Sequence, residues 1–201
     1  MKYKIILADP PWNYKFSQSR SRYIIHKYDT MELDEICSIP VKDLADEDSV
    51  LFLWVTFPKL NWAMPVIEAW GFEYKTCAFV WVKTNKNFAV NQISFLPHDT
   101  IDKFTGMGYY TRSNVEICLL ATKGQPLPRL RHDISQVVYE PLEKHSKKPD
   151  IVRTNIVSLF GDLPRIELFA REATEGWTAL GNGIDGKDIK DSIQSLASDE
   201  A

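Results

Sequence analysis

Short apolar runs alternate with polar connections along most of the chain. Five of the runs are continuous and rich in β-branched and aromatic residues, which is typical of strands buried on both faces of a sheet. They predict strands at residues 4–8, 50–55, 72–83, 115–121 and 165–169.

Two segments between these runs have helical spacing. Apolar residues recur at three- and four-residue steps over 58–70, and Gly71 provides a stop, while Pro65 predicts a kink or a later start. Residues 149–160 have Pro149 and Asp150 in the first turn, where both residue types favour a helix. Strands alternating with helices predict an α/β fold with a parallel-rich central sheet and helices on both faces.

The same pattern suggests how the chain is organised. Residues 1–184 are expected to form a single domain, followed by a polar and frayed tail at 185–201. The long polar stretch at 85–111 is either a substrate loop or partly disordered.

Composition narrows the class of protein. The 201 residues are 44% hydrophobic and 25% charged, which is average for a globular domain and unlike a disordered tail or a disulfide scaffold. The sequence has neither a membrane-length apolar run nor a signal peptide, so we expect a cytoplasmic protein. Cys37, Cys77 and Cys118 are far apart, and we expect small core residues rather than metal ligands, with no metal bound. The net charge of -3 argues against a broadly basic surface but leaves room for a local basic groove.

The candidate chemistry begins directly after the first predicted strand, at Asp9-Pro10-Pro11-Trp12. Two prolines stiffen the backbone at the carboxyl end of a strand, which is where α/β sheets bind ligands. The Asp9 carboxylate and the Pro10 carbonyl can each accept one N–H of an exocyclic amine on an aromatic ring, and the Trp12 indole can lie against that ring. Two fixed acceptors would restore lone-pair character to the amine and prepare it for transfer of a methyl group from a sulfonium.

These residues carry a resemblance to a known family. The chain resembles the DPPW-type N6-adenine methyltransferases, the family of the catalytic subunit of the eukaryotic mRNA adenosine methyltransferase, and looks like a short bacterial or phage-like member. Further matching motifs follow in order at 51–56 (LFLWVT), 70–71 (WG), 80–85 (VWVKTN), 148–150 (KPD), 166–171 (IELFAR) and 177–182 (WTALGN).

The resemblance implies a Rossmann-like, S-adenosylmethionine-dependent methyltransferase fold in circularly permuted motif order. Asp9 would serve both the target amine and the methionine end of the cofactor, and Lys148 the carboxylate or ribose region of the cofactor. By the same resemblance, Glu167 and Arg171 hold ribose hydroxyls, Leu168 and Phe169 line the pocket, and Asn182 closes it. The connection between residues 171 and 177 is shorter than in those relatives and lacks their His-Asn pair, which leaves the grip on the cofactor's adenine open.

Basic residues form local clusters although the net charge of the chain is negative. Residues 13–28 carry four basic and no acidic side chains, interleaved with aromatics, and residues 144–148 form a second basic cluster. Such clusters suit phosphates and unstacked bases, so we interpret them as loops around an extruded adenine, with solvated surface charge as the alternative. The candidates for binding nucleic acid are Tyr14, Lys15, Arg20, Arg22, His145 and Lys147, together with Tyr110, Arg112 and Glu116, which the resemblance places near the target base.

The leading hypothesis is therefore an S-adenosylmethionine-dependent methyltransferase acting on the N6 amine of adenine in nucleic acid. DNA is preferred because the sequence reads as a minimal catalytic domain, and RNA is the second candidate substrate. The sequence also leaves open a non-catalytic nucleic-acid-binding partner subunit, or methylation of a side-chain amide on a protein. It allows a monomer, a homodimer or a paired subunit.

Overall fold

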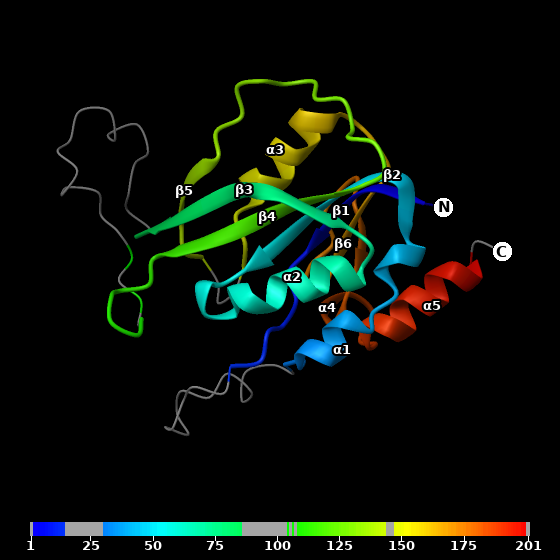
Figure 1. Ribbon diagram of the computed structural model, residues 1–201, viewed down its shortest axis with the longest axis horizontal. Coiled ribbons are helices and arrows are strands. Elements are labelled where there is room, and N and C mark those ends of the chain that lie inside the picture. Colours follow the sequence, from blue (N-terminus) through cyan, green and yellow to red (C-terminus); the bar gives the residue numbers. More distant parts are fainter. Residues whose placement is uncertain are drawn as a thin grey trace. The chain divides into compact units, whose positions relative to one another are not determined.

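The structure is a computed structural model of the chain, and it describes residues 2–14, 30–85, 104, 106, 108–143 and 147–199. These residues form a seven-stranded sheet of order β5-β3-β4-β2-β1-β6-β7, seen in Figure 1. The pairings β1–β2, β1–β6, β3–β5 and β6–β7 are parallel, which confirms the parallel-rich sheet. The strands are β1 (Tyr3–Ala8), β2 (Ala45–Val55), β3 (Glu73–Thr84), β4 (Val115–Lys123), β5 (Val137–Pro141), β6 (Arg165–Leu168) and β7 (Thr178–Leu180).

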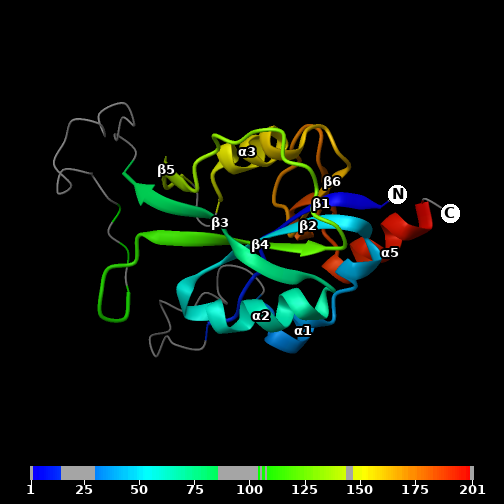
Figure 2. The same ribbon diagram turned by 45° about the horizontal axis from the view of Figure 1, so that its top comes forward.

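Among the described residues, α-helices lie in three of the six connections between consecutive strands. Within the first half of the chain, α1 and α2 lie side by side, as both ribbon views show (Figures 1 and 2). In the part of the chain that the structure describes, no helix is long and apolar enough to cross a membrane. The helices are α1 (Leu33–Cys37), α2 (Leu60–Ala69), α3 (Asp150–Phe160), α4 (Asn182–Asp185) and α5 (Ile189–Asp199), with 3₁₀ turns η3 (Val41–Asp43) and η4 (Phe57–Lys59).

The chain divides into two compact units. The first unit comprises Met1–Thr76, Leu119–Leu127 and Leu163–Ala201, and the second comprises Cys77–Cys118 and Pro128–Asp162. Strands β1, β2, β6 and β7 therefore belong to the first unit, β5 and α3 belong to the second, and β3 and β4 contribute residues to both.

The core of the first unit is built around β1 and β2. Ile5 and Ile6 of β1 and Leu51 and Leu53 of β2 are completely buried. A strand in the middle of a parallel sheet is covered on both faces, which explains why these runs are apolar without alternation. Trp70, also fully buried, follows α2 and donates its indole N–H to the Ile36 carbonyl of α1 at 2.9 Å, which joins the two helices.

The five predicted strands are confirmed, with differences at their ends. Strand β2 begins at Ala45, five residues before the predicted start. Its first residues are mostly polar and its pairing with β1 shifts register there, so no apolar run marks this part of the strand. The helix predicted at 58–70 is a 3₁₀ turn followed by α2, and α2 runs through Pro65 instead of starting after it. A proline removes only one helical hydrogen bond, and α2 is held by burial of Ala63, Val66 and Ile67.

The expectation of a frayed end at 185–201 is wrong for most of that segment. Residues Ile189–Asp199 form α5, and Ile189, Ser192 and Ile193 are buried. The Ser192 hydroxyl also donates to the Asp185 carboxylate at 2.7 Å. Within residues 189–196, the part of α5 whose burial is described, the buried side chains form one narrow stripe, and composition alone does not reveal a stripe of that kind.

We expect Leu53→Ala to lower the free energy of unfolding by about 2–5 kcal/mol, because it leaves a cavity in a fully buried strand. Urea denaturation measures the change. The matched control is Phe57→Ala, just beyond the same strand, where the side chain is 55% exposed and the expected change is within about 0.5 kcal/mol. Equal losses in the two variants would contradict this assignment of the core.

Candidate active site

The carboxyl ends of β1, β6 and β7 lie level with one another in the first unit. Ala8 of β1 pairs with Leu168 of β6, and Leu168 pairs with Leu180 of β7. The next residue on each strand is therefore Asp9, Phe169 or Gly181, in one row at neighbouring strand spacings of about 4.8 Å. The register thus brings together three segments that the sequence separates by up to 172 positions, the difference between 181 and 9.

The Asp9–Trp12 segment is fastened along its backbone. The Trp12 N–H donates to the Pro10 carbonyl at 2.8 Å, and the Met31 N–H donates to the Pro11 carbonyl at 2.8 Å. One lone pair of the Pro10 carbonyl is thereby occupied and the second is available to a ligand N–H. Asp9 itself is half-buried, so its carboxylate is held near the surface by a loop whose backbone has little freedom.

Trp12 anchors this loop to the neighbouring strand. Its side chain is 4% exposed, and its indole N–H donates to the Trp54 carbonyl of β2 at 3.2 Å. This bond gives the tryptophan a structural role that sequence reasoning missed, beside the stacking role predicted for it. A buried indole N–H needs a hydrogen-bond acceptor, and the Trp54 carbonyl provides it for Trp12.

Tyr14 is held by the same end of β2. Its hydroxyl is hydrogen-bonded to the Thr56 hydroxyl, directly after the strand. The ammonium of Lys59 lies 5.7 Å from the centre of the Tyr14 ring and 3.1 Å from the centre of the Trp62 ring. Lys59 is only 5% exposed, so these cation–π contacts are shielded from water and correspondingly stronger. The expected substrate residue Tyr14 therefore has a defined orientation.

The ends of β6 and β7 approach each other closely. Phe169 has a φ of 63°, the left-handed region that non-glycine residues rarely adopt. A Cβ at Gly181, where φ is 156°, would lie 2.5 Å from the Ala170 carbonyl oxygen. A Cβ at Gly183 would lie 2.7 Å from the Arg171 Cα. Glycine is thus required sterically where the two strand ends meet, and backbone strain at a strand end of this type is common at ligand sites.

The residues expected to bind the cofactor divide into a buried and an exposed set. Glu167 is 8% exposed on β6, in register with Leu7 of β1, and Leu168 is fully buried beside it. Arg171 and Asn182 are exposed just beyond the ends of β6 and β7. A buried carboxylate flanked by exposed donors is a donor set that suits a polar ligand with vicinal hydroxyls.

A separate charged cluster lies in the second unit. Glu116 of β4 forms ion pairs with Lys83 of β3 and with Lys148, the latter at 3.3 Å, and all three side chains are at most 15% exposed. Burial raises the pKa of Glu116, but the charges of Lys148 and Lys83 and their hydrogen bonds outweigh it and leave the pKa below its ordinary value. The structure therefore joins two predicted site residues, Lys148 and Glu116, in a buried ion-pair network.

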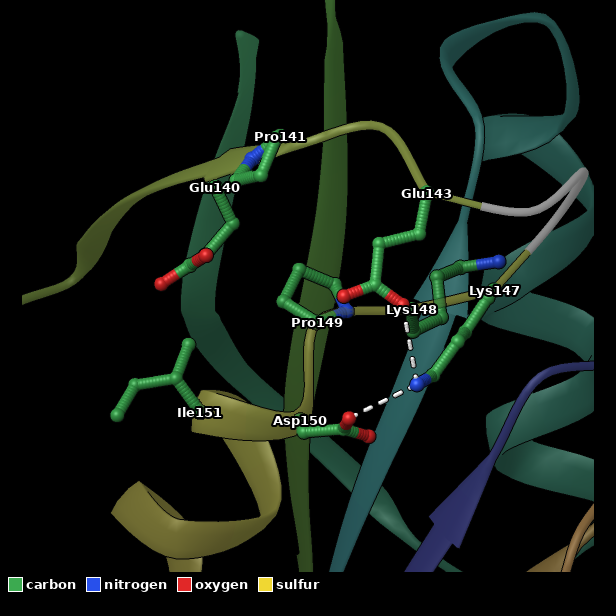
Figure 3. A pocket seen from close by; sticks show the side chains of 8 residues that line it. All are labelled: Glu140, Pro141, Glu143, Lys147, Lys148, Pro149, Asp150 and Ile151. Carbon is green, nitrogen blue, oxygen red and sulfur yellow. Dashed lines mark hydrogen bonds and ion pairs between the residues drawn. The ribbon is translucent and has the colours of Figure 1, made fainter. Parts of the chain in front are cut away.

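Lys147 faces carboxylates of its own unit. Its ammonium lies 2.9 Å from Asp150 and 3.1 Å from Glu143, and Figure 3 shows it between the two while Lys148 extends away from them.

A nearby cavity of about 200 Å³ is lined by both acidic and basic side chains. Its acids offset its lysines, which makes it a poor site for a polyanion. The lining residues are Glu140, Pro141, Glu143, Lys147, Lys148, Pro149, Asp150 and Ile151.

The remaining predicted residues fall into two groups. Tyr110 and Arg112 are exposed in the segment before β4. Lys15, Arg20, Arg22 and His145 lie outside the described residues.

The cysteines are less uniform than expected. Cys118 is buried, as a small core residue would be, but Cys37 and Cys77 are half-buried. Burial raises the pKa of both half-buried thiols, and the charge of Asp34 adds to the effect at Cys37. Among the described residues there is no cluster of His, Cys, Asp and Glu that would suit a metal ion.

Comparisons with known proteins identify the family of the chain. The family model described as MT-A70 matches residues 3–183. The chain is 32% identical over 207 residues to the Type II methyltransferase M.MunI of a Mycoplasma species, covering 94% of this chain and 81% of the relative. It is 30% identical to a probable N(6)-adenosine-methyltransferase MT-A70-like protein of rice and 28% identical to the human N(6)-adenosine-methyltransferase catalytic subunit METTL3. Each match covers 94% of this chain but only 24% and 30% of those two longer proteins.

We expect Glu116→Gln to lower the free energy of unfolding at neutral pH by about 1.5–3 kcal/mol, because two buried lysines lose charged acceptors. A lowered folded-state pKa means that this stabilisation is present above the ordinary pKa of 4.5 and is lost as pH falls through the folded-state value. The stabilities of wild type and variant should therefore converge in acid, which denaturation at a series of pH values would show. Glu68→Gln, at an exposed position of α2, is the control and should follow wild type throughout. A gap of constant size at every pH would contradict the ion-pair assignment.

Proposed function

The chain belongs to the MT-A70 family of methyltransferases, and we propose that it transfers a methyl group from S-adenosylmethionine to the N6 amine of adenine in nucleic acid. The observation that supports this most directly is the position of Asp9. Its carboxylate leaves β1 level with Phe169 and Gly181, on a loop fixed by two prolines and by hydrogen bonds to Trp54 and Met31. The loop can therefore hold a substrate amine in one orientation.

The chemistry proposed for this loop needs no covalent enzyme intermediate. Bound S-adenosylmethionine supplies a methyl group on a positively charged sulfur. The Asp9 carboxylate and the second lone pair of the Pro10 carbonyl accept hydrogen bonds from the two amine N–H groups and hold the hydrogens out of the ring plane, so that the nitrogen lone pair is less delocalised into the ring. The N–C bond would form as the C–S bond breaks, the electron pair of that bond would stay on sulfur, and the proton lost from the nitrogen would pass to water. Positioning of this kind is worth up to about 7–11 kcal/mol.

The described residues fit such a cofactor. Glu167 offers a buried carboxylate for ribose hydroxyls, and Arg171 and Asn182 offer exposed donors. Phe169 is half-buried and offers apolar surface, whereas the neighbouring Leu168 is fully buried. The left-handed backbone conformation of Phe169 and the absence of side chains at Gly181 and Gly183 allow the ends of β6 and β7 to approach each other closely. We assign Lys148 to the carboxylate or ribose region of the cofactor, and this assignment rests on the family resemblance alone.

DNA is the proposed substrate, with RNA as the second candidate. The match to the Type II methyltransferase extends over 81% of that protein, whereas the matches to the adenosine methyltransferases extend over 24% and 30% of theirs. The matched region thus makes up most of the Type II methyltransferase but only a limited part of each adenosine methyltransferase. The candidate partner subunits are a second copy of this chain and a related chain, and the enzyme assay tests whether methyl transfer needs one.

The substrate is identified by methyl transfer to single-stranded DNA, duplex DNA and RNA of mixed sequence. Labelled S-adenosylmethionine supplies the methyl group, and the products are digested to nucleosides and analysed by mass spectrometry. N6-methylated adenine in the DNA pools supports the proposal, and label in RNA alone replaces DNA with RNA as the substrate. Cofactor binding without label in any pool favours a non-catalytic or partner-dependent chain, and label in protein alone favours amide methylation.

We expect Asp9→Ala to lower the transfer rate at least about a thousandfold, which corresponds to a loss of about 4 kcal/mol of transition-state stabilisation. The fold should be retained because Asp9 lies on a half-exposed loop after β1. Single-turnover kinetics measures the rate and circular dichroism the fold. Asp34→Ala, at an exposed position of α1 in the same unit, is the matched control and should keep wild-type turnover. Wild-type turnover in Asp9→Ala would remove Asp9 from the mechanism.

A further inference from the structure

The segment that leads into β4 doubles back on itself and carries two tyrosines at its bend. A Cβ on Gly106 would overlap the Ser113 carbonyl oxygen, and a Cβ on Gly108 would overlap the Thr111 carbonyl oxygen. The backbone before the bend therefore lies close to the backbone after it. In Figures 1 and 2 this segment lies beyond the start of β4, opposite the arrowhead, and turns back toward the strand. Its base is fixed to β3, because Phe104 donates to the Lys83 carbonyl at 3.0 Å and Lys83 donates to the Asn114 carbonyl at 2.8 Å.

The two rings at the bend are almost completely exposed. Tyr109 is 89% exposed and Tyr110 is 94% exposed, the highest values among the exposed large hydrophobic residues described. Their ring centres are 4.9 Å apart at an interplanar angle of 84°, which is an edge-to-face pair. In that arrangement the edge of one ring covers the face of the other, and the outer ring faces stay open to a partner.

We propose that Tyr109 and Tyr110 form a stacking element for unpaired bases of the nucleic acid substrate. This inference rests on the proposed function and deepens it, because it assigns the enzyme a preference for strands whose bases are unstacked. Aromatic side chains bind such bases through their π faces, irrespective of base identity. Bases within a duplex have both faces covered by their neighbours, so an exposed tyrosine gains a stacking partner only from an unpaired or extruded base.

The surroundings of the pair favour a nucleic acid over a protein partner. Residues 108–114 read GYYTRSN and contain no aliphatic side chain, so the apolar surface at the bend consists of the two rings. An apolar patch this small is far below the area that a stable protein interface buries. Arg112 is exposed two residues after Tyr110 and offers the positive charge that a phosphate next to a stacked base requires.

The test is fluorescence anisotropy with a labelled single-stranded DNA oligonucleotide and with the matching duplex. Replacing both tyrosines, Tyr109→Ala with Tyr110→Ala, should weaken binding of the single strand by about 5- to 150-fold, the value expected for one lost base stack. Binding of the duplex should change by less than about twofold. Replacing both with phenylalanine retains the rings and should preserve binding of the single strand. Tyr74→Ala, at a 42% exposed position of β3, is the control for loss of a surface tyrosine and should behave as wild type.

Salt dependence separates stacking from charge. The double alanine variant should keep the wild-type slope of log affinity against log salt, whereas Arg112→Ala should reduce that slope by about one. Unchanged binding of the single strand in the double alanine variant would overturn the proposal. Equal losses on single strand and duplex, or an equal loss in the double phenylalanine variant, would also overturn it. Methyl transfer by wild type is measured beside these experiments, so that failure of the proposed function, with no nucleic acid labelled, remains distinguishable from failure of the stacking element.

Discussion

The parallel register of β6 between β1 and β7 is the constraint on which the candidate active site depends. Backbone hydrogen bonds align Ala8, Leu168 and Leu180, and the three segments that follow must then emerge side by side. A shift of one residue in either pairing would exchange the faces of a strand and turn Glu167 away from its present side. The buried apolar residues of β1 and β6 prevent such a shift, so the core of the first unit also determines where the site residues lie.

The ends of β6 and β7 show how closely this arrangement is packed. Phe169 adopts a backbone conformation that costs free energy, and Gly181 and Gly183 have no room for a side chain. On the other side, β2 holds the Asp9–Trp12 loop through the Trp54 carbonyl, and Thr56 holds Tyr14. Asp9 is therefore flanked by fixed backbone on both sides, which suits a reaction that depends on orientation more than on acid–base groups.

Much of this could be predicted from the sequence, and the exceptions have physical reasons. The apolar runs identified five strands because buried parallel strands are apolar on both faces. Strand β7 is only three residues long, and in β5 only Val138 is buried while Glu140 and Pro141 end the strand, so neither strand contains a continuous buried apolar run. Helix α5 was missed because the buried residues described in it form a narrow stripe. The motif identified the Asp9 loop, but the indole bond of Trp12 and the pairing of Lys148 with Glu116 are long-range contacts that no local pattern contains.

The position of β1 in the sheet has a consequence for the synthesis of the protein. The strand that leads to Asp9 leaves the ribosome long before its partner β6, which begins at Arg165. Pairing between segments so distant in sequence is intrinsically slow, because the intervening chain must be ordered or looped out. A nascent or truncated chain that ends before β6 exposes one edge of β1 and lacks the second wall of the site. The site can therefore assemble only after β6 and β7 have been synthesised.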